Sequence, residues 1–196
     1  MKKLFIAICF ITFTFASVIN IPDDYDTIQM GIVFAANGDT VLVADGTYSG
    51  DGNVNIDFYG KAITLLTNGA TISAGSEARA FNIHTQEDTT TVIEGFTISG
   101  SGADLDEGGA IKIYEDSSIK IKNCTFSNNR ALQKGGAIFI DNGFVFIENS
   151  TFNNNGSYSS VTGTVLPTNG GAINVENGTL IIHNTIFEDN GATYNG

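Results

Sequence analysis

The sequence predicts an all-β protein, a right-handed parallel β-helix whose coils of about 26 residues each hold three strands. Three observations predict this fold. A Gly-Gly-Ala-Ile motif occurs three times, beginning at Gly108, Gly135 and Gly170. An Ile-x-Asn-x-x-Phe-x-x-Asn motif follows each copy, and apolar residues stand at every second position inside the repeats.

The second motif gives the length of a coil. Its first position is held by four isoleucines that are 28, 26 and 35 residues apart: Ile93, Ile121, Ile147 and Ile182. The spacing of 35 equals 26 plus an insertion of 9, which falls in the polar stretch at residues 156–169. A solenoid tolerates such an insertion because the neighbouring coils need not change.

The alternation inside each repeat has a period of two, which predicts strands. Three short strands in one coil cannot pair with each other, so each should pair in parallel with its equivalent about 4.8 Å away. The residues expected to face inward are Ile111, Ile113, Ile119, Ile121, Phe126 and their counterparts in the next two coils, including Phe152 and Phe187. The glycine pairs should supply positive φ, and Asn123, Asn149 and Asn184 should form a ladder of turn residues.

A short capping helix is expected at the N-terminal end of the solenoid. Asp26 would be its N-cap, with Ile28, Ile32 and Ala35 or Ala36 on one face and Asn37-Gly38 at its end. It would cover a first coil that begins at residues 40–43. At the other end, Gly196 stands nine residues after Phe187, where earlier coils place the next glycine pair. This register predicts a domain truncated from a longer protein.

The first residues are typical of a signal peptide. Lys2 and Lys3 precede an apolar stretch of 12 residues, and Thr14-Phe15-Ala16 offers small residues for cleavage. We therefore expect a signal peptide at residues 1–16, a β-helix domain at residues 17–196, and export to the extracellular space or the cell outer-membrane surface; a retained N-terminal anchor is the alternative. Only Cys124 would remain, so no intramolecular disulfide is expected.

The charge excludes some classes of partner. The formal net charge is −12, and removal of Lys2 and Lys3 makes it −14. Such a surface repels phosphate backbones and anionic lipid, which argues against nucleic-acid binding. No second long apolar run follows the signal peptide, so no transmembrane segment is expected in the mature chain.

The repeated motifs also resemble a known family. Gly-Gly-Ala-Ile paired with Phe-x-x-Asn (Phe126 to Asn129, Phe152 to Asn155, Phe187 to Asn190) resembles the repeats of chlamydial polymorphic outer-membrane proteins. Residues 21–29 (IPDDYDTIQ) and 38–48 (GDTVLVADGTY) look like the opening of many pectin-lyase-like β-helix proteins. The resemblance implies the fold, but it carries over no catalytic residue, because such proteins include lyases, hydrolases and adhesins.

Outward-facing residues offer one candidate ligand-binding surface. Phe139, Phe146 and Ile181 have outward parity and could form an exposed apolar stripe, of the kind that contacts partners or sugars. The alternative is that the loop at residues 156–169 covers this stripe.

Acidic side chains offer a candidate Ca²⁺ site. Asp141 and Glu176 follow aligned strand ends, and stacked carboxylates favour a cation between them. The alternative is that Asp141-Asn142-Gly143 and the matching turn at Glu176 are ordinary soluble turns. The acidic loop at Asp104, Asp106 and Glu107 lacks the spacing of a calcium loop.

No catalytic residue is predicted. Lys122, Glu148 and His183 should align on the outside of the second strand, and a histidine beside a carboxylate can do acid–base chemistry, but an exposed polar face looks the same. His84 is expected to be isolated.

We therefore expect a non-enzymatic secreted or cell-surface β-helix, adhesin-like or structural, and a monomeric domain of a longer chain. Its expected partners are a polysaccharide or a host or cell-surface protein. The alternatives are a carbohydrate-active enzyme, either a polysaccharide lyase or a glycoside hydrolase, and a passenger domain of an exported outer-membrane protein.

Overall fold

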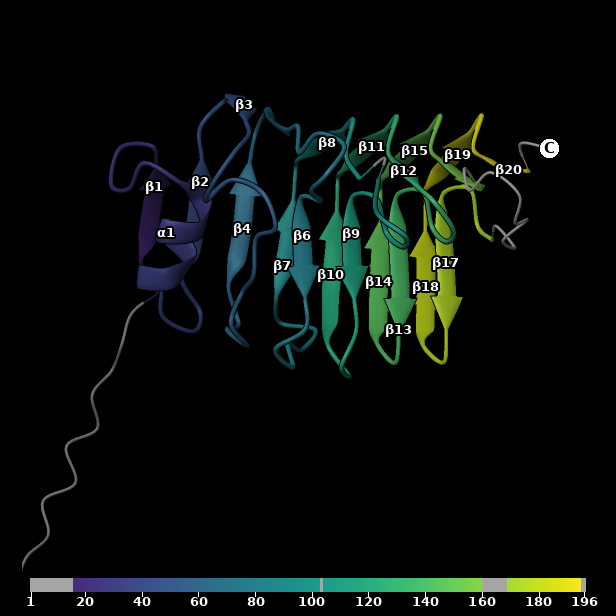
Figure 1. The fold of residues 1–196 in the computed structure, drawn as a ribbon. Coiled ribbons are helices and arrows are strands. Elements are labelled where there is room, and N and C mark those ends of the chain that lie inside the picture. Colours follow the sequence, from purple (N-terminus) through teal and green to yellow (C-terminus); the bar gives the residue numbers. More distant parts are fainter. Residues whose placement is uncertain (1–15, 103, 160–168, 195–196) are drawn as a thin grey trace, which may run out of the picture.

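Parallel pairing between successive coils builds the molecule. The computed structural model describes residues 16–102, 104–159 and 169–194, and Figure 1 shows their strands stacked side by side in one row of coils. The predicted signal peptide up to residue 15, the expected glycine position at Gly196 and residues 160–168 of the predicted loop lie outside the described residues. Every pair of named strands is parallel, as the repeats predict.

Two sheets run through most of the coils. Sheet A contains β1 (Val18–Ile21), β2 (Thr40–Val43), β4 (Thr64–Thr67), β7 (Val92–Glu94), β10 (Ser118–Lys122), β14 (Phe144–Glu148) and β18 (Thr179–His183), in that order. Sheet B contains β3 (Gly46–Tyr48), β5 (Ala70–Ile72), β8 (Thr97–Ser99), β11 (Thr125–Ser127), β15 (Thr151–Asn153) and β19 (Ile186–Glu188).

Two shorter sheets close the later coils. Sheet C contains β6 (Phe81–Ile83), β9 (Ile111–Ile113), β13 (Ile138–Asp141) and β17 (Ile173–Glu176). Sheet D contains β12 (Arg130–Ala131), β16 (Gly156–Ser159) and β20 (Gly191–Tyr194). Sheets A, B and C are the three predicted strands of each coil. Sheet D was not predicted, and its strand β16 corrects the expectation that residues 156–159 belong to a loop.

The predicted inward residues form the core of the inner coils, while their counterparts Val175, Ile182 and Phe187 in the last described coil are partly exposed. Ile111, Ile121 and their counterparts Ile138 and Ile147 are fully buried. The phenylalanines of the second motif stack face to face: the ring centroids of Phe126 and Phe152 are 4.6 Å apart, and those of Phe152 and Phe187 are 4.9 Å apart. Because parallel pairing places identical residues one strand spacing apart, a repeat in the sequence becomes a column in the core.

A ladder of buried asparagines runs beside the phenylalanine column. The side-chain amide nitrogen (Nδ2) of Asn129 donates to Oδ1 of Asn155 at 3.0 Å, and Nδ2 of Asn155 donates to Oδ1 of Asn190 at 2.9 Å. Each Nδ2 also donates to a backbone carbonyl, that of Phe126 in the case of Asn155. These amides therefore link three coils through the interior.

The predicted asparagine ladder is only partly present. Asn123, Asn149 and Asn184 do adopt the expected left-handed turn, with φ between 44° and 53°. Asn184 donates from Nδ2 to Asn149 at 2.7 Å, but Asn123 donates to Glu94 instead. The continuous ladder is formed by the last asparagine of each motif, which lies in the interior. The turn asparagine is exposed, so its side chain can hydrogen-bond to other groups.

The two glycines of each Gly-Gly pair serve different purposes. The first has positive φ, 61° at Gly108 and Gly135 and 64° at Gly170, as predicted. The second has no room for a side chain, because sheet D passes against it: a Cβ on Gly136 would lie 2.4 Å from the backbone nitrogen of Gly156.

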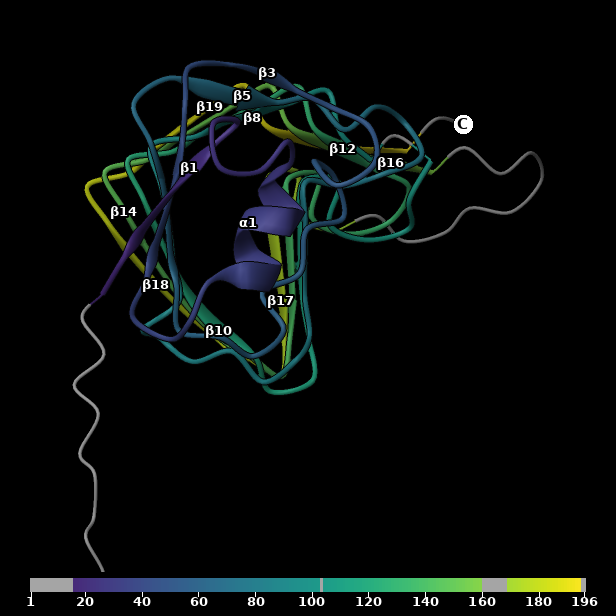
Figure 2. The same ribbon diagram turned by 90° about the vertical axis from the view of Figure 1, so that its left-hand side faces the viewer.

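A helix covers the N-terminal end, as predicted. Figure 2, which looks along the coils from this end, shows α1 (Ile28–Phe34) lying in front of their interior. Its buried residues are Ile28, Gly31 and Ile32. The N-cap is Thr27 and not Asp26, because Thr27 has the extended backbone and its side chain accepts a hydrogen bond from the N–H of Met30 at 3.3 Å.

Two further features of this end correct the prediction. Strand β1 pairs with β2, so sheet A begins at Val18 and not at Thr40. The ammonium group of Lys61, from the next coil, donates to the last carbonyls of α1, at Ile32, Val33 and Ala35 (2.6–2.9 Å). This lysine satisfies acceptors that a helix end leaves free.

Across residues 16–102, 104–159 and 169–194, no helix has the length and apolar character needed to span a membrane.

The ladder leads to a stability prediction. Asn155→Ala leaves the buried donors of Asn129 without an acceptor, and we expect it to lower the free energy of unfolding by about 3 kcal/mol. Asn153→Ala is the matched control, because its side chain faces outward, and should change stability by less than about 0.5 kcal/mol. Urea unfolding followed by circular dichroism measures both; equal effects would contradict the structural role of the ladder.

The free thiol gives a second prediction. Cys124 is fully buried, and burial raises the pKa of its thiol to about 12. A protein prepared without residues 1–16, and so without Cys9, should therefore not react in the native state at pH 8 with a thiol reagent such as Ellman's reagent, and should react fully in denaturant. Thr179→Cys, at an exposed position on β18, is the positive control. Equal labelling rates of Cys124 and the introduced cysteine in the native state would contradict this burial.

Candidate functional site

Rings, lysines and carboxylates gather on the outer face of sheet C. Strand register places Asn82, Lys112, Phe139 and Asn174 in one row across four coils. A second row lies two residues later along the strands and consists of His84, Tyr114, Asp141 and Glu176. We call this surface the sheet C face; it consists of Asn82, His84, Lys112, Tyr114, Phe139, Asp141, Asn174 and Glu176, with Glu107 and Lys134 beside them.

Two lysines cover the ring of Phe139. The ammonium nitrogens of Lys112 and Lys134 each lie 5.7 Å from its centroid, and Lys112 lies 5.2 Å from the centroid of Tyr114. These distances allow cation–π attraction. Phe139 is only 2% exposed. The prediction that it forms part of an exposed apolar stripe is therefore wrong, because parity places its ring outward but the lysines enclose it.

Carboxylates neutralise both lysines. Glu107 lies 3.0 Å from Lys112 and 3.5 Å from Lys134, and Glu176 lies 2.8 Å from Lys134. The hydrogen bond to Glu176 raises the pKa of Lys134 above its ordinary value, so the lysine stays charged at neutral pH. The signal for this cluster was available in the sequence, since Glu107 and Lys134 each precede a glycine pair and lie in register.

The two candidate calcium ligands are neighbours in register. Asp141 pairs with Glu176 across β13 and β17, as predicted. The ammonium group of Lys134 already forms an ion pair with the carboxylate of Glu176. Within the part of the chain that the structure describes, no group of three or more His, Cys, Asp and Glu side chains is arranged to hold a metal ion. Calcium binding at this pair stays a prediction.

His84 is not isolated, contrary to expectation. Its Nε2 lies 3.5 Å from Oδ2 of Asp57, and its ring stacks on Tyr114 with centroids 5.1 Å apart. Asp57 is nearly buried and accepts hydrogen bonds from the N–H of Tyr59 and the hydroxyl of Thr85. Tyr114 follows the same outward parity as His84. Asp57 follows Ile56, which bridges in parallel to Phe81 of β6, so Asp57 lies one coil earlier beside the same face. No Gly-Gly motif precedes residues 56–58, so the repeated motifs did not reveal this coil.

Among the described residues, two polar atoms beside this face are buried without a hydrogen-bond partner. They are Nη1 of Arg79 and Oδ1 of Asn174. Burial lowers the pKa of Arg79, while the nearby Tyr114 and Glu107 act in the opposite direction. The guanidinium therefore adds a positive charge near Tyr114 and Glu107.

The other two predicted stripe residues lie on sheet A. Phe146 and Ile181 are register partners on β14 and β18, and Ile181 is 37% exposed. The ring of His183 lies 5.3 Å from that of Phe146. The structure therefore brings Phe146 and Ile181 together but separates both from Phe139. A binding role for this pair stays a prediction, and residues 160–168 of the loop proposed to cover it are outside the described residues.

The predicted polar row on sheet A is present. Glu148 is the register partner of both Lys122 and His183. Lys122 and Glu148 form an ion pair at 2.9 Å, and this hydrogen bond raises the pKa of Lys122.

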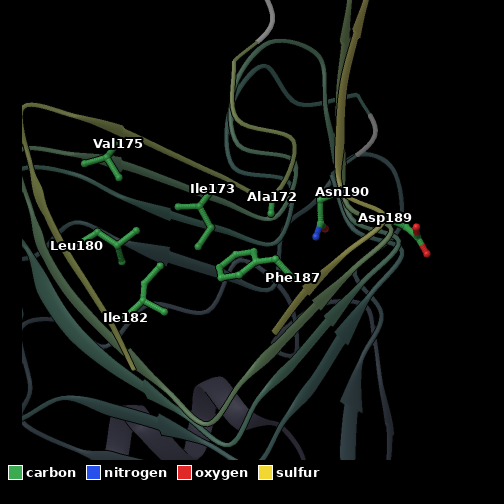
Figure 3. A pocket seen from close by; sticks show the side chains of 8 residues that line it. All are labelled: Ala172, Ile173, Val175, Leu180, Ile182, Phe187, Asp189 and Asn190. Atoms are coloured by element: carbon green, nitrogen blue, oxygen red, sulfur yellow. The ribbon is translucent and has the colours of Figure 1, made fainter. Parts of the chain in front are cut away.

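The C-terminal end of the solenoid contains an open apolar hollow of about 510 Å³. Figure 3 shows Ile173, Leu180, Ile182 and Phe187 pointing into it, with Asp189 turned away at its rim. The remaining lining residues are Ala172, Val175 and Asn190. The hollow lies between the last described strands of sheets A, B and C.

Comparisons with known proteins agree with this architecture. The family model described as right handed beta helix region matches residues 25–193, and it confirms the predicted hand of the coil. Comparison with curated proteins and with solved structures gave no match. The chain therefore belongs to the family of right-handed β-helix proteins.

Proposed function

We propose that this protein is an exported, non-enzymatic β-helix that acts at the cell surface as an adhesin-like or structural scaffold. We further propose that it is part of a longer protein of the polymorphic outer-membrane type, as its repeats suggest. The observation that carries the proposal is the sheet C face, where rings and paired charges are held in register across four coils.

The physical argument rests on preorganisation. Backbone pairing fixes the spacing of the side chains on this face, and the ion pairs of Lys112 and Lys134 fix their orientation. A rigid surface loses little conformational entropy when it binds, so more of the contact energy is kept. Aromatic rings bordered by charged groups suit a polysaccharide or a cell-surface protein. The net charge of −12 favours such partners over nucleic acid.

A pair of matched variants tests the binding face. Lys112→Ser with Tyr114→Ser removes a lysine and an aromatic ring from the sheet C face. Lys120→Ser with Phe146→Ser likewise removes a lysine and an aromatic ring, from register partners on sheet A. The probes are an array of neutral and acidic polysaccharides and fixed epithelial cells. We expect the first variant to bind at least about tenfold more weakly, or about 1.4 kcal/mol, and the second to bind like the parent protein.

The other outcomes are equally informative. Loss of binding only in the sheet A variant would move the site to the Phe146–Ile181 pair. If the parent protein binds none of the probes, the adhesin proposal is contradicted.

One observation favours a second function, a carbohydrate-active enzyme. His84 pairs with the nearly buried carboxylate of Asp57 and retains 30% of its side-chain surface, which is the geometry of an oriented general base. The chain would then act as a polysaccharide lyase or a glycoside hydrolase.

A polysaccharide panel separates the two functions. Under the scaffold proposal, the protein should release no reducing sugar and no unsaturated uronate above the blank. If the parent protein releases such sugars and the His84→Asn variant, with an unchanged circular dichroism spectrum, does not, the protein is an enzyme and the scaffold proposal is wrong.

A further inference from the structure

The outer face of sheet B carries a column of threonines. Strand register places one threonine from each of five successive coils beside the next: Thr47, Thr71, Thr97, Thr125 and Thr151. A second column, two residues later along the strands, contains Ser99, Ser127 and Asn153. We call these eight residues the sheet B face; each is at least partly exposed, and Figure 1 shows β8, β11 and β15 of this sheet in one row along the top of the view.

The sheet B face is uncharged, unlike the outer faces of sheets A and C. Strands β3, β5, β8, β11 and β15 contain no acidic or basic residue, in a chain whose net charge is −12. Sheet A presents the ion pair of Lys122 with Glu148, and sheet C presents two paired lysines. The threonine column ends at β19, where Ile186 takes the threonine position and Glu188 introduces a charge. An uncharged face on an acidic protein favours an uncharged partner, because no charge has to lose its water when the two surfaces meet.

The hydroxyl groups of this face are not used inside the protein. Among the contacts of the described residues, no side-chain hydroxyl of the five threonines, of Ser99 or of Ser127 forms a hydrogen bond. The backbone nevertheless fixes their spacing, at about 4.8 Å between coils and about 6.6 Å between the two columns. The β-branched threonine side chain is also stiff at χ1, so its hydroxyl and methyl groups have preset positions. The sheet B face is therefore a regular array of hydroxyl groups that are available to an outside partner.

We propose that the sheet B face binds the surface of an ice crystal. Ice presents water oxygens in a flat lattice whose repeat distances are close to the two spacings of this face. Each hydroxyl group can donate one hydrogen bond and accept others, so strand register aligns a column of them with a row of lattice waters. Because the array is already ordered, little conformational entropy is lost when it binds. The sheet B face contains no aromatic ring on which a sugar would stack, whereas the sheet C face contains Tyr114.

A matched pair of variants tests this binding. Thr97→Tyr places a large ring in the middle of the sheet B face, and Thr64→Tyr makes the same change at an outward position of β4 on sheet A. Thermal hysteresis and the fraction of protein taken up by slowly growing ice are measured for the parent chain and both variants, and circular dichroism melting checks that each is folded. We expect the parent chain and Thr64→Tyr to show hysteresis and uptake into ice, and Thr97→Tyr to lose most of both. Thr97→Ser is a milder second variant, and it should lose part of the hysteresis because it lacks the methyl group and the stiff rotamer.

The remaining results would contradict ice binding by this face. If the parent chain shows neither hysteresis nor uptake into ice, it does not bind ice, and equal effects of Thr97→Tyr and Thr64→Tyr would place ice binding elsewhere. Retention of the parent chain on an insoluble neutral polysaccharide, lost only in Thr97→Tyr and without any effect on ice, would assign the face to a polysaccharide instead. Lys112→Ser with Tyr114→Ser should leave the hysteresis unchanged, so ice binding and the function proposed for the sheet C face can each fail without the other.

Discussion

Parallel backbone pairing between equivalent strands of successive coils is the constraint on which the rest of the structure depends. It sets one residue of a coil directly beside the corresponding residue of the next, so position in the repeat becomes position in a column. The phenylalanine stack, the buried asparagine ladder and the inward isoleucines all follow from this single rule. Within the described residues no disulfide contributes, because Cys124 is a buried free thiol.

The same rule organises the outer surface, where its consequence depends on what each column contains. On sheet A it produces a row in which Lys122 pairs with Glu148. On sheet C it brings Lys112, Phe139 and Glu176 into one neighbourhood with Lys134 and Tyr114. A surface built in this way is stiff, since each side chain is anchored to a paired strand. Stiffness and repetition suit a scaffold that presents a binding surface, which is why we favour that function.

The first and last described coils differ in how their apolar residues are covered. At the N-terminal end, α1 lies over the first coil and Lys61 satisfies its last carbonyls. At the other end, Phe187 and Ile182 remain partly exposed around an apolar hollow.

The sequence by itself determined the repeat length, the inward positions, the phenylalanine stack, the positive φ of the first glycine in each pair and the presence of a capping helix. These features are periodic or local, so they can be read from one repeat or from a few adjacent residues. Only the tertiary structure decided that Phe139 lies beneath Lys112 and Lys134, that His84 meets Asp57, and that β1 and sheet D exist. Lys112 and Phe139 are register partners, but parity alone does not tell whether a long side chain folds over a neighbouring ring. Asp57, Lys134 and the strands β1 and β16 lie in segments without the repeated motifs, and packing against coils that are distant in the sequence fixes their positions.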